Sequence, residues 1–183
     1  GWIGDITRSA DARGNARVDV KLDIPLLHSV DTRVSGSLVL QNNDLTLVDV
    51  PPFSRLNGTF AFNERGIHFS NLTSGFLGGQ ARLDATTRAD GTIAVTATGT
   101  TTPAGLKRAI DIDVVHRLLD RAQGSARYSA SLTTQPGGML IVAESDLMGM
   151  AIDGIAPVRK GTGDALPLRV ETNARRRPSG DRA

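Results

Sequence analysis

The sequence predicts a mostly β fold: a long antiparallel sheet that curls on itself, with a short helical interruption near residues 103–122. Three observations support this prediction. Apolar and polar residues alternate over most of the chain, as in strands with one apolar face. Turn-forming residues separate these alternating segments. Between Pro103 and Ala122 the apolar residues recur every four positions instead, which is helical spacing.

Two strands and a short third one are predicted near the start of the chain. In segment 16–25, Val, Leu and Ile alternate with Asp and Lys, and segment 33–41 continues the pattern. The run Asn42–Asp44 predicts a turn, followed by a short strand at 45–50. Pro51-Pro52 is expected to end that strand, because proline cannot donate a hydrogen bond to a ladder.

Two hairpins are predicted in the middle of the chain. The first spans 55–72 and turns at 63–66, and the second joins two strands across Asp90-Gly91. Between them, Gly78 and Gly79 interrupt the strand pattern. Adjacent glycines within a sheet typically mark a bulge or a bend, so we expect these two residues to bend or break their strand.

The helical interruption is expected to consist of two short helices. Pro103 suits a first helical turn, and Asp113 is a candidate N-cap for the second helix. Alternation returns at 125–133 and again at 139–155, with a Pro-Gly-Gly turn between these two segments.

Length and charge indicate how the chain is organised. Its 183 residues suit one domain or a slice of a larger one, and because it opens on Gly1 we expect a fragment. We predict one β-rich segment of a larger domain at 1–171 and a disordered basic tail at 172–183. The net charge of the whole chain is +2. The four arginines and one aspartate from Arg175 onward sum to +3, so the residues before Arg175 carry a net charge of −1. Nucleic acid is therefore not an expected partner.

The sequence contains no recognisable catalytic or metal-binding motif. It has no cysteine, and its three histidines do not lie at metal-ligand spacing. The stretch Lys160–Gly163 lacks the rest of a phosphate-binding loop, and no Gly-x-Ser-x-Gly elbow occurs. We therefore predict that the protein is not an enzyme and uses neither a cofactor nor a metal.

The apolar faces of the strands are the candidate working surface. A sheet with an apolar face must cover it with another layer, and about twenty helical residues give little cover for about ten strands. The sheet must therefore curl on itself or hold something apolar. Alternation alone identifies ten candidate lining residues: Val18, Val20, Leu22, Leu38, Leu40, Phe60, Phe62, Leu83, Ile93 and Val95.

Three passages carry a family resemblance. The first, LTLVDVPPFSRLNGTFAFNERGIHFSNLTSGFLGGQARLD, has a short strand, a proline link, a Leu-x-Gly strand, a glycine turn and a strand ending at Gly-Gly. The second, GLKRAIDIDVVHRLLDRAQGSARYSASL, has a helix and then a strand. The third, ESDLMGMAIDGIAPVRKGTGDALPLRVE, has a Ser-x-Leu-x-Gly strand, a proline loop with a lysine and a final Leu-Pro-Leu. In this order the motifs resemble the AsmA-like superfamily, specifically its YhdP branch, over most of Val34 to Glu171. One departure is Ile155-Ala156-Pro157, where the branch usually has Leu-Pro.

The resemblance implies a protein anchored to the inner membrane, with a long periplasmic body. That body is expected to be an apolar β-groove that carries phospholipids between the inner and outer membranes and binds their acyl chains. Membrane contact is expected through parts outside this chain. Ten residues of strand span about 33 Å, enough to shelter an acyl chain. The alternatives are a β-sandwich or β-solenoid, and a structural or scaffolding β-module of the envelope that carries no lipid.

Overall fold

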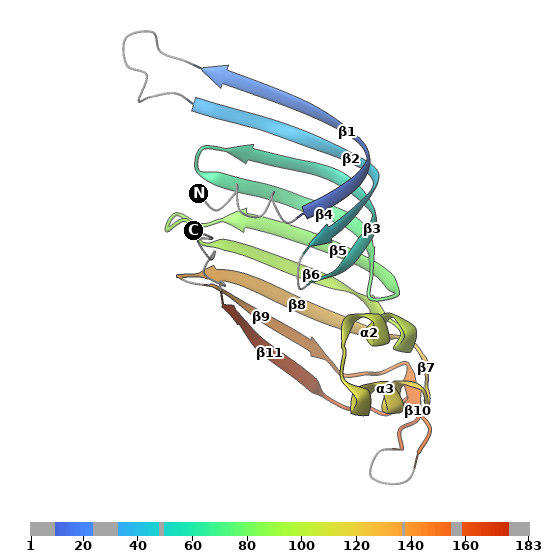
Figure 1. The fold of residues 1–183 in the computed structure, drawn as a ribbon. Coiled ribbons are helices and arrows are strands. Elements are labelled where there is room, and N and C mark those ends of the chain that lie inside the picture. Colours follow the sequence, from blue (N-terminus) through green and yellow to red (C-terminus); the bar gives the residue numbers. More distant parts are fainter. Residues whose placement is uncertain (1–9, 24–32, 48–49, 137, 155–158, 176–183) are drawn as a thin grey trace, which may run out of the picture.

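A computed structural model describes residues 10–23, 33–47, 50–136, 138–154 and 159–175. Nine strands form one antiparallel sheet in the order β1-β2-β3-β4-β5-β6-β8-β9-β11 (Figure 1). Within these residues β1 and β11 are the two edges and do not pair with each other, so the sheet is open. The prediction of a mostly β chain with one long antiparallel sheet is confirmed, and the described strands form neither a sandwich nor a solenoid.

The strands follow one another along the sheet in the same order as along the chain. Helices α2 and α3 and strand β7 lie between β6 and β8 in the chain, and β10 lies between β9 and β11. Strands β7 and β10 pair as a small second sheet. The bounds of the elements are β1 Ala10–Asp23, β2 Arg33–Leu47, β3 Val50–Asn63, β4 Gly66–Phe76, β5 Gly79–Thr87, β6 Ile93–Thr101, α2 Pro103–Ala109, α3 Asp113–Leu119, β7 Ala122–Gly124, β8 Ala126–Gln135, β9 Gly138–Ser145, β10 Met150–Ile152 and β11 Leu168–Arg175.

The N-terminal strands are longer than expected. The predicted turn at Asn42–Asp44 is wrong, because β2 runs straight through it to Leu47. Asn42 has a φ of 54° and forms a β-bulge, which interrupts the alternation as a turn would without reversing the chain. Pro51 and Pro52 do not end a strand either. They lie in the first residues of β3, a position where a missing donor is tolerated.

The hairpin turns lie close to where the sequence indicates. The turn between β3 and β4 is held by Asn63, whose Oδ1 accepts from the backbone N–H groups of Arg65 (2.8 Å) and Gly66 (3.1 Å). The predicted turn at Asp90-Gly91 joins β5 and β6. Gly78 and Gly79, which are expected to bend or break their strand, lie at the turn where β4 ends and β5 begins.

The helical interruption is confirmed as the two helices α2 and α3. The Oγ1 of Thr102 caps α2 by accepting from the backbone N–H of Gly105 (3.2 Å). Asp113 is the first residue of α3, and Ile112 stands at the N-cap, so the expected capping role of Asp113 is not observed. An aspartate in the first turn still favours the helix through its charge at the N-terminus.

The β-rich segment extends beyond the boundary predicted between residues 171 and 172. Strand β11 pairs with β9 up to Arg175, so residue 172 lies inside a strand. The rest of the predicted tail, 176–183, lies outside the described residues, as do Ile155–Pro157 of the third motif.

A small second core lies beside α2, where Leu106 packs on the buried side chains of Ala126, Leu147 and Met150. Lys160 is buried next to it, and its Nζ donates to three carbonyl groups, those of Leu147 (2.8 Å), Met150 (2.8 Å) and Gly161 (3.1 Å). The three ammonium protons therefore all have acceptors, which is what a buried charge requires.

Candidate functional site

One face of the large sheet carries an apolar row that crosses every strand. Residues that pair directly across an antiparallel ladder point to the same face. The register links one residue from each of the nine strands, and eight of the nine are apolar: Val18, Leu38, Phe60, Phe69, Ala85, Val95, Leu132, Ile141 and Thr172. We call the side of the sheet that bears this row the apolar face.

All ten candidate lining residues lie on the apolar face. Val18, Leu38, Phe60 and Val95 belong to the row itself. The other six stand two or four positions from a row residue on the same strand, with no bulge between, and therefore point the same way: Val20, Leu22, Leu40, Phe62, Leu83 and Ile93. Their contact with a ligand stays a prediction.

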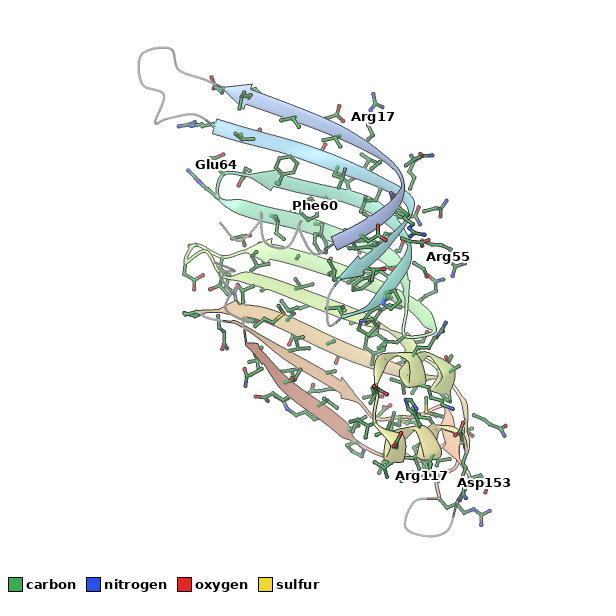
Figure 2. All side chains as sticks on the ribbon, viewed as in Figure 1. Arg17, Arg55, Phe60, Glu64, Arg117 and Asp153 are labelled. Atoms are coloured by element: carbon green, nitrogen blue, oxygen red, sulfur yellow. The ribbon has the colours of Figure 1, made fainter. Side chains whose placement is uncertain are left out.

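The opposite face differs in composition. Its corresponding row is made of polar or small residues except for Leu140: Asp19, Ser37, Ala61, His68, Thr86, Ala94, Thr133, Leu140 and Asn173. His68 is exposed there, as its position between Ile67 and Phe69 indicates. In Figure 2, Arg17 and Arg55 extend outward from the sheet, whereas Phe60 lies over it. The sheet is thus two-sided, with one face suited to water and one to an apolar contact.

The apolar face is covered in its middle and open at its edges. Leu56, Leu72 and Leu83 are buried in one cluster, and Leu72 is 3% exposed. At the β1 edge, Val18, Val20 and Leu22 are 57%, 60% and 55% exposed, and at the β11 edge Leu168 and Val170 are also exposed. Among the described elements each strand of the sheet contacts chiefly its neighbours in order, and no second layer packs on this face.

A line of β-bulges bends the sheet and makes the buried cluster. Gly14, Asn42, Arg55 and Asn71, one from each of β1–β4, have positive φ angles and coincide with register shifts. Near these bulges β1, β2 and β3 curve sharply (Figure 1). Bulges increase bend and twist in just this way. The curvature brings Leu45 and Phe53, among others, to pack against the buried cluster of Leu56, Leu72 and Leu83.

Polar side chains bond the backbone at these bulges. The Oδ1 of Asn57 accepts from the N–H of Asn42 (3.0 Å), and the Oδ1 of Asp44 accepts from the N–H of Arg55 (3.0 Å). On β5, the Oδ1 of Asp84 accepts from the N–H of Asn71 (2.9 Å). These bulges are not among the features predicted from the sequence. Their signal is a change in the phase of alternation beside an asparagine, a residue that tolerates positive φ.

Gly78 and Gly79 allow the β4–β5 turn to pack closely on the end of β6 and the start of α2. The carbonyl oxygen of Leu77 accepts from the Oγ1 of Thr101 (3.0 Å) and from the N–H of Thr102 (3.2 Å). A Cβ on Gly78 would lie 2.2 Å from the Oγ1 of Thr102, and one on Gly79 would lie 2.2 Å from the carbonyl oxygen of Thr100. The two glycines therefore serve close approach at the end of the apolar face.

An aromatic pair and a tyrosine mark this same end of the apolar face. The rings of Phe53 and Phe76 stack with their centroids 4.4 Å apart. Tyr128 lies over Gly99, and its buried hydroxyl has no hydrogen-bond partner among the described residues. Burial raises the pKa of Tyr128 to about 12.

The described part of the chain contains no cluster of three or more His, Asp or Glu side chains that could hold a metal ion. No helix in the described ranges is both long and apolar enough to cross a membrane.

Comparison with known proteins gives one family. The family model described as YhdP protein matches residues 1–181. No curated protein and no solved structure matches the chain.

Proposed function

Because the chain belongs to the YhdP family, a group of AsmA-like envelope proteins, we propose that its curled sheet is a segment of a groove that carries phospholipids between the inner and outer membranes. In this proposal the acyl chains lie on the apolar face and the phosphate-bearing headgroups stay in water at the rim. The full protein is periplasmic and is anchored to the inner membrane by parts outside this chain.

One observation carries the proposal. The row from Val18 to Ile141 is apolar on eight consecutive strands of the sheet, and it remains accessible at the β1 edge. Apolar surface that stays exposed, as it does at the β1 and β11 edges of this face, typically marks a site of contact with an apolar partner. An apolar path that runs from strand to strand lets an acyl chain move without breaking hydrogen bonds, because the face offers none. Such transport requires no general acid, base or metal.

The test is native mass spectrometry of the protein purified without added lipid. The proposal predicts bound species whose masses and fragments are those of phospholipids. The same protein stripped of lipid is expected to take phospholipid up again from vesicles of phosphatidylethanolamine and phosphatidylglycerol. A chain that retains no lipid and extracts none from these vesicles would contradict the proposal and favour a structural module of the envelope.

A further inference from the structure

The outer edge of β1 is open to another strand. Among the described residues β1 pairs with β2 alone, so the N–H and C=O groups along its other edge are free to form a further ladder (Figure 1). Val18, Val20 and Leu22, on the apolar face of β1, are each more than half exposed. We propose that this edge pairs with β1 of a second copy of the chain, as antiparallel strands related by a two-fold axis. This inference goes beyond the proposed function, because it does not depend on a lipid cargo.

The opposite face of β1 carries charges that alternate in sign. Four exposed residues form this row: Arg17, Asp19, Lys21 and Asp23. Among the described residues their one ion pair joins Arg17 to Asp19 along the strand, at 3.9 Å. Across the ladder Asp19 and Lys21 face serines of β2, so neither has an opposite charge on the neighbouring strand. A row of alternating sign matches a copy of itself that runs in the opposite direction.

This self-complementarity specifies a register. With the two-fold axis at Val20, Asp19 lies opposite Lys21 of the second copy, and Arg17 lies opposite Asp23 of the second copy. The symmetry repeats each contact, so every charge of the row faces an opposite charge. Opposite charges directly across an antiparallel ladder stabilise the pairing, and like charges destabilise it.

The same register pairs the apolar residues. Val20 lies opposite itself, and Val18 lies opposite Leu22 of the second copy. A two-fold axis normal to the sheet keeps the apolar faces of both copies on the same side. The second copy therefore covers the apolar side chains that β2 leaves exposed, and the two apolar faces become continuous.

A register centred on Val18 fits less well. It places Lys21 opposite the uncharged Asn15, and it brings Leu22 opposite Gly14, where a bulge shifts the register of β1. The register centred on Val20 uses only the stretch 17–23, which contains no bulge.

Pairing of β1 with β11 of another copy also fits less well. These strands are the first and last of an antiparallel series of nine, so they run in the same direction. With both apolar faces on one side their ladder would be parallel, and parallel pairing is slightly less stable per residue. On β11, Arg169 is already paired with Glu144 and Glu171.

Disulfide crosslinking of the whole chain tests the register, because the sequence has no cysteine of its own. Val20→Cys is expected to form a covalent dimer under mild oxidation. Directly opposed residues have Cα atoms about 4.5–5.5 Å apart, within the range that a disulfide spans. Val18→Cys is the matched control, since it lies on the same face with similar exposure. It is expected not to link to itself, but to link to Leu22→Cys when the two variants are mixed.

Analytical ultracentrifugation of the whole chain tests the charges. Asp19→Lys sets lysine against Lys21 at two symmetric contacts and is expected to raise the dissociation constant of the dimer about tenfold. The double variant Asp19→Lys with Lys21→Asp restores opposite charges at both contacts and is expected to regain the dissociation constant of the parent chain. Both positions are exposed, so the variants are expected to fold, as circular dichroism will check.

Three results would overturn the inference. The first is a parent chain that stays monomeric at every concentration tested. The second is a Val18→Cys chain that links to itself as readily as Val20→Cys, which indicates another register or random collision. The third is a dimer that Asp19→Lys leaves unchanged or that the double variant does not restore, which places the contact elsewhere. None of these results bears on lipid binding, which the native mass spectrometry tests separately.

Discussion

At the scale of single residues, the path of this sheet depends on positions that carry positive φ or lack a Cβ. Asn42 and Asn71 adopt left-handed backbone conformations within strands, and Gly79 meets a neighbouring carbonyl group. The sequence alone indicates that Gly78 and Gly79 matter, because adjacent glycines are rare in strands. It does not reveal their purpose, since the residues that approach them, Thr100 of β6 and Thr102 at the start of α2, follow more than twenty positions later in the chain.

Gly79→Val is expected to lower the free energy of unfolding by about 2–4 kcal/mol, beyond the effect of strand propensity. The new side chain would start 2.2 Å from the carbonyl oxygen of Thr100, and backbone atoms cannot yield cheaply. Gly163→Val is the control, because an added Cβ there has no atom within 4 Å. Urea denaturation of the two variants measures the difference, and equal stabilities would show that the close approach is not needed.

Tyr128→Phe is expected to leave stability unchanged or to raise it by up to about 1 kcal/mol, because it removes a buried hydroxyl that bonds to no described residue.

The parent chain should also lose stability above pH 10. Since burial raises the pKa of Tyr128 to about 12, the folded state holds this proton more tightly than the unfolded state. The loss should appear between about pH 10 and 12 and be smaller in the variant. Thermal melts across this range give the comparison, and identical pH profiles would contradict the account.

At the scale of elements, alternation predicts which face each strand segment presents, because the period of two is a local property. Leu38 and Leu40 are in phase with each other, as are Leu45 and Leu47, but the two pairs are out of phase. A turn and a bulge both produce such a change, so the sequence analysis placed a turn at Asn42–Asp44 where the structure has a bulge. The helices were predictable for the same local reason, from their spacing of four.

Asn42→Val is expected to destabilise the protein by about 1–2 kcal/mol, because a β-branched residue fits a φ of 54° poorly. Gln41→Val, one position earlier, is the matched control. Gln41 is an exposed strand residue, and valine has a higher strand propensity. Guanidinium denaturation compares the two. If Asn42→Val proves as stable as Gln41→Val, the bulge does not constrain the backbone at this position.

Lys160→Met tests the second core. Removing the ammonium group takes one donor from each of three carbonyl groups, and of these Leu147 and Gly161 keep a backbone donor. We expect a loss of about 2–4 kcal/mol in the free energy of unfolding. Lys107→Met is the control, because its ion pair with Asp120 lies at the surface and such pairs contribute less than about 1 kcal/mol. Comparable losses in chemical denaturation of the two variants would show that the buried contacts of Lys160 contribute little.

At the scale of the whole molecule, the sheet is a single open layer that curves around its own apolar side. The sequence indicates a shortage of cover, because it contains many alternating strands and few helical residues. It could not indicate where the cover would come from. The buried cluster forms because bulges in β2 and β3 bring Leu45 and Phe53 onto Leu72 and Leu83, and such contacts depend on the curvature of four strands together.

The central claim, that the apolar face contacts phospholipid chains, is tested most directly by site-specific photocrosslinking in cells that produce the full-length protein. A photoreactive amino acid replaces Leu40 or Phe62 on the apolar face, and Asp19 or Ala61 on the opposite face. Ala61 and Phe62 are consecutive residues of β3, so their side chains point to opposite faces of the sheet at the same place along the strand. The account predicts phospholipid adducts at Leu40 and Phe62 and none at Asp19 and Ala61. Equal labelling of both faces, or no phospholipid adduct at any of the four positions, would contradict it.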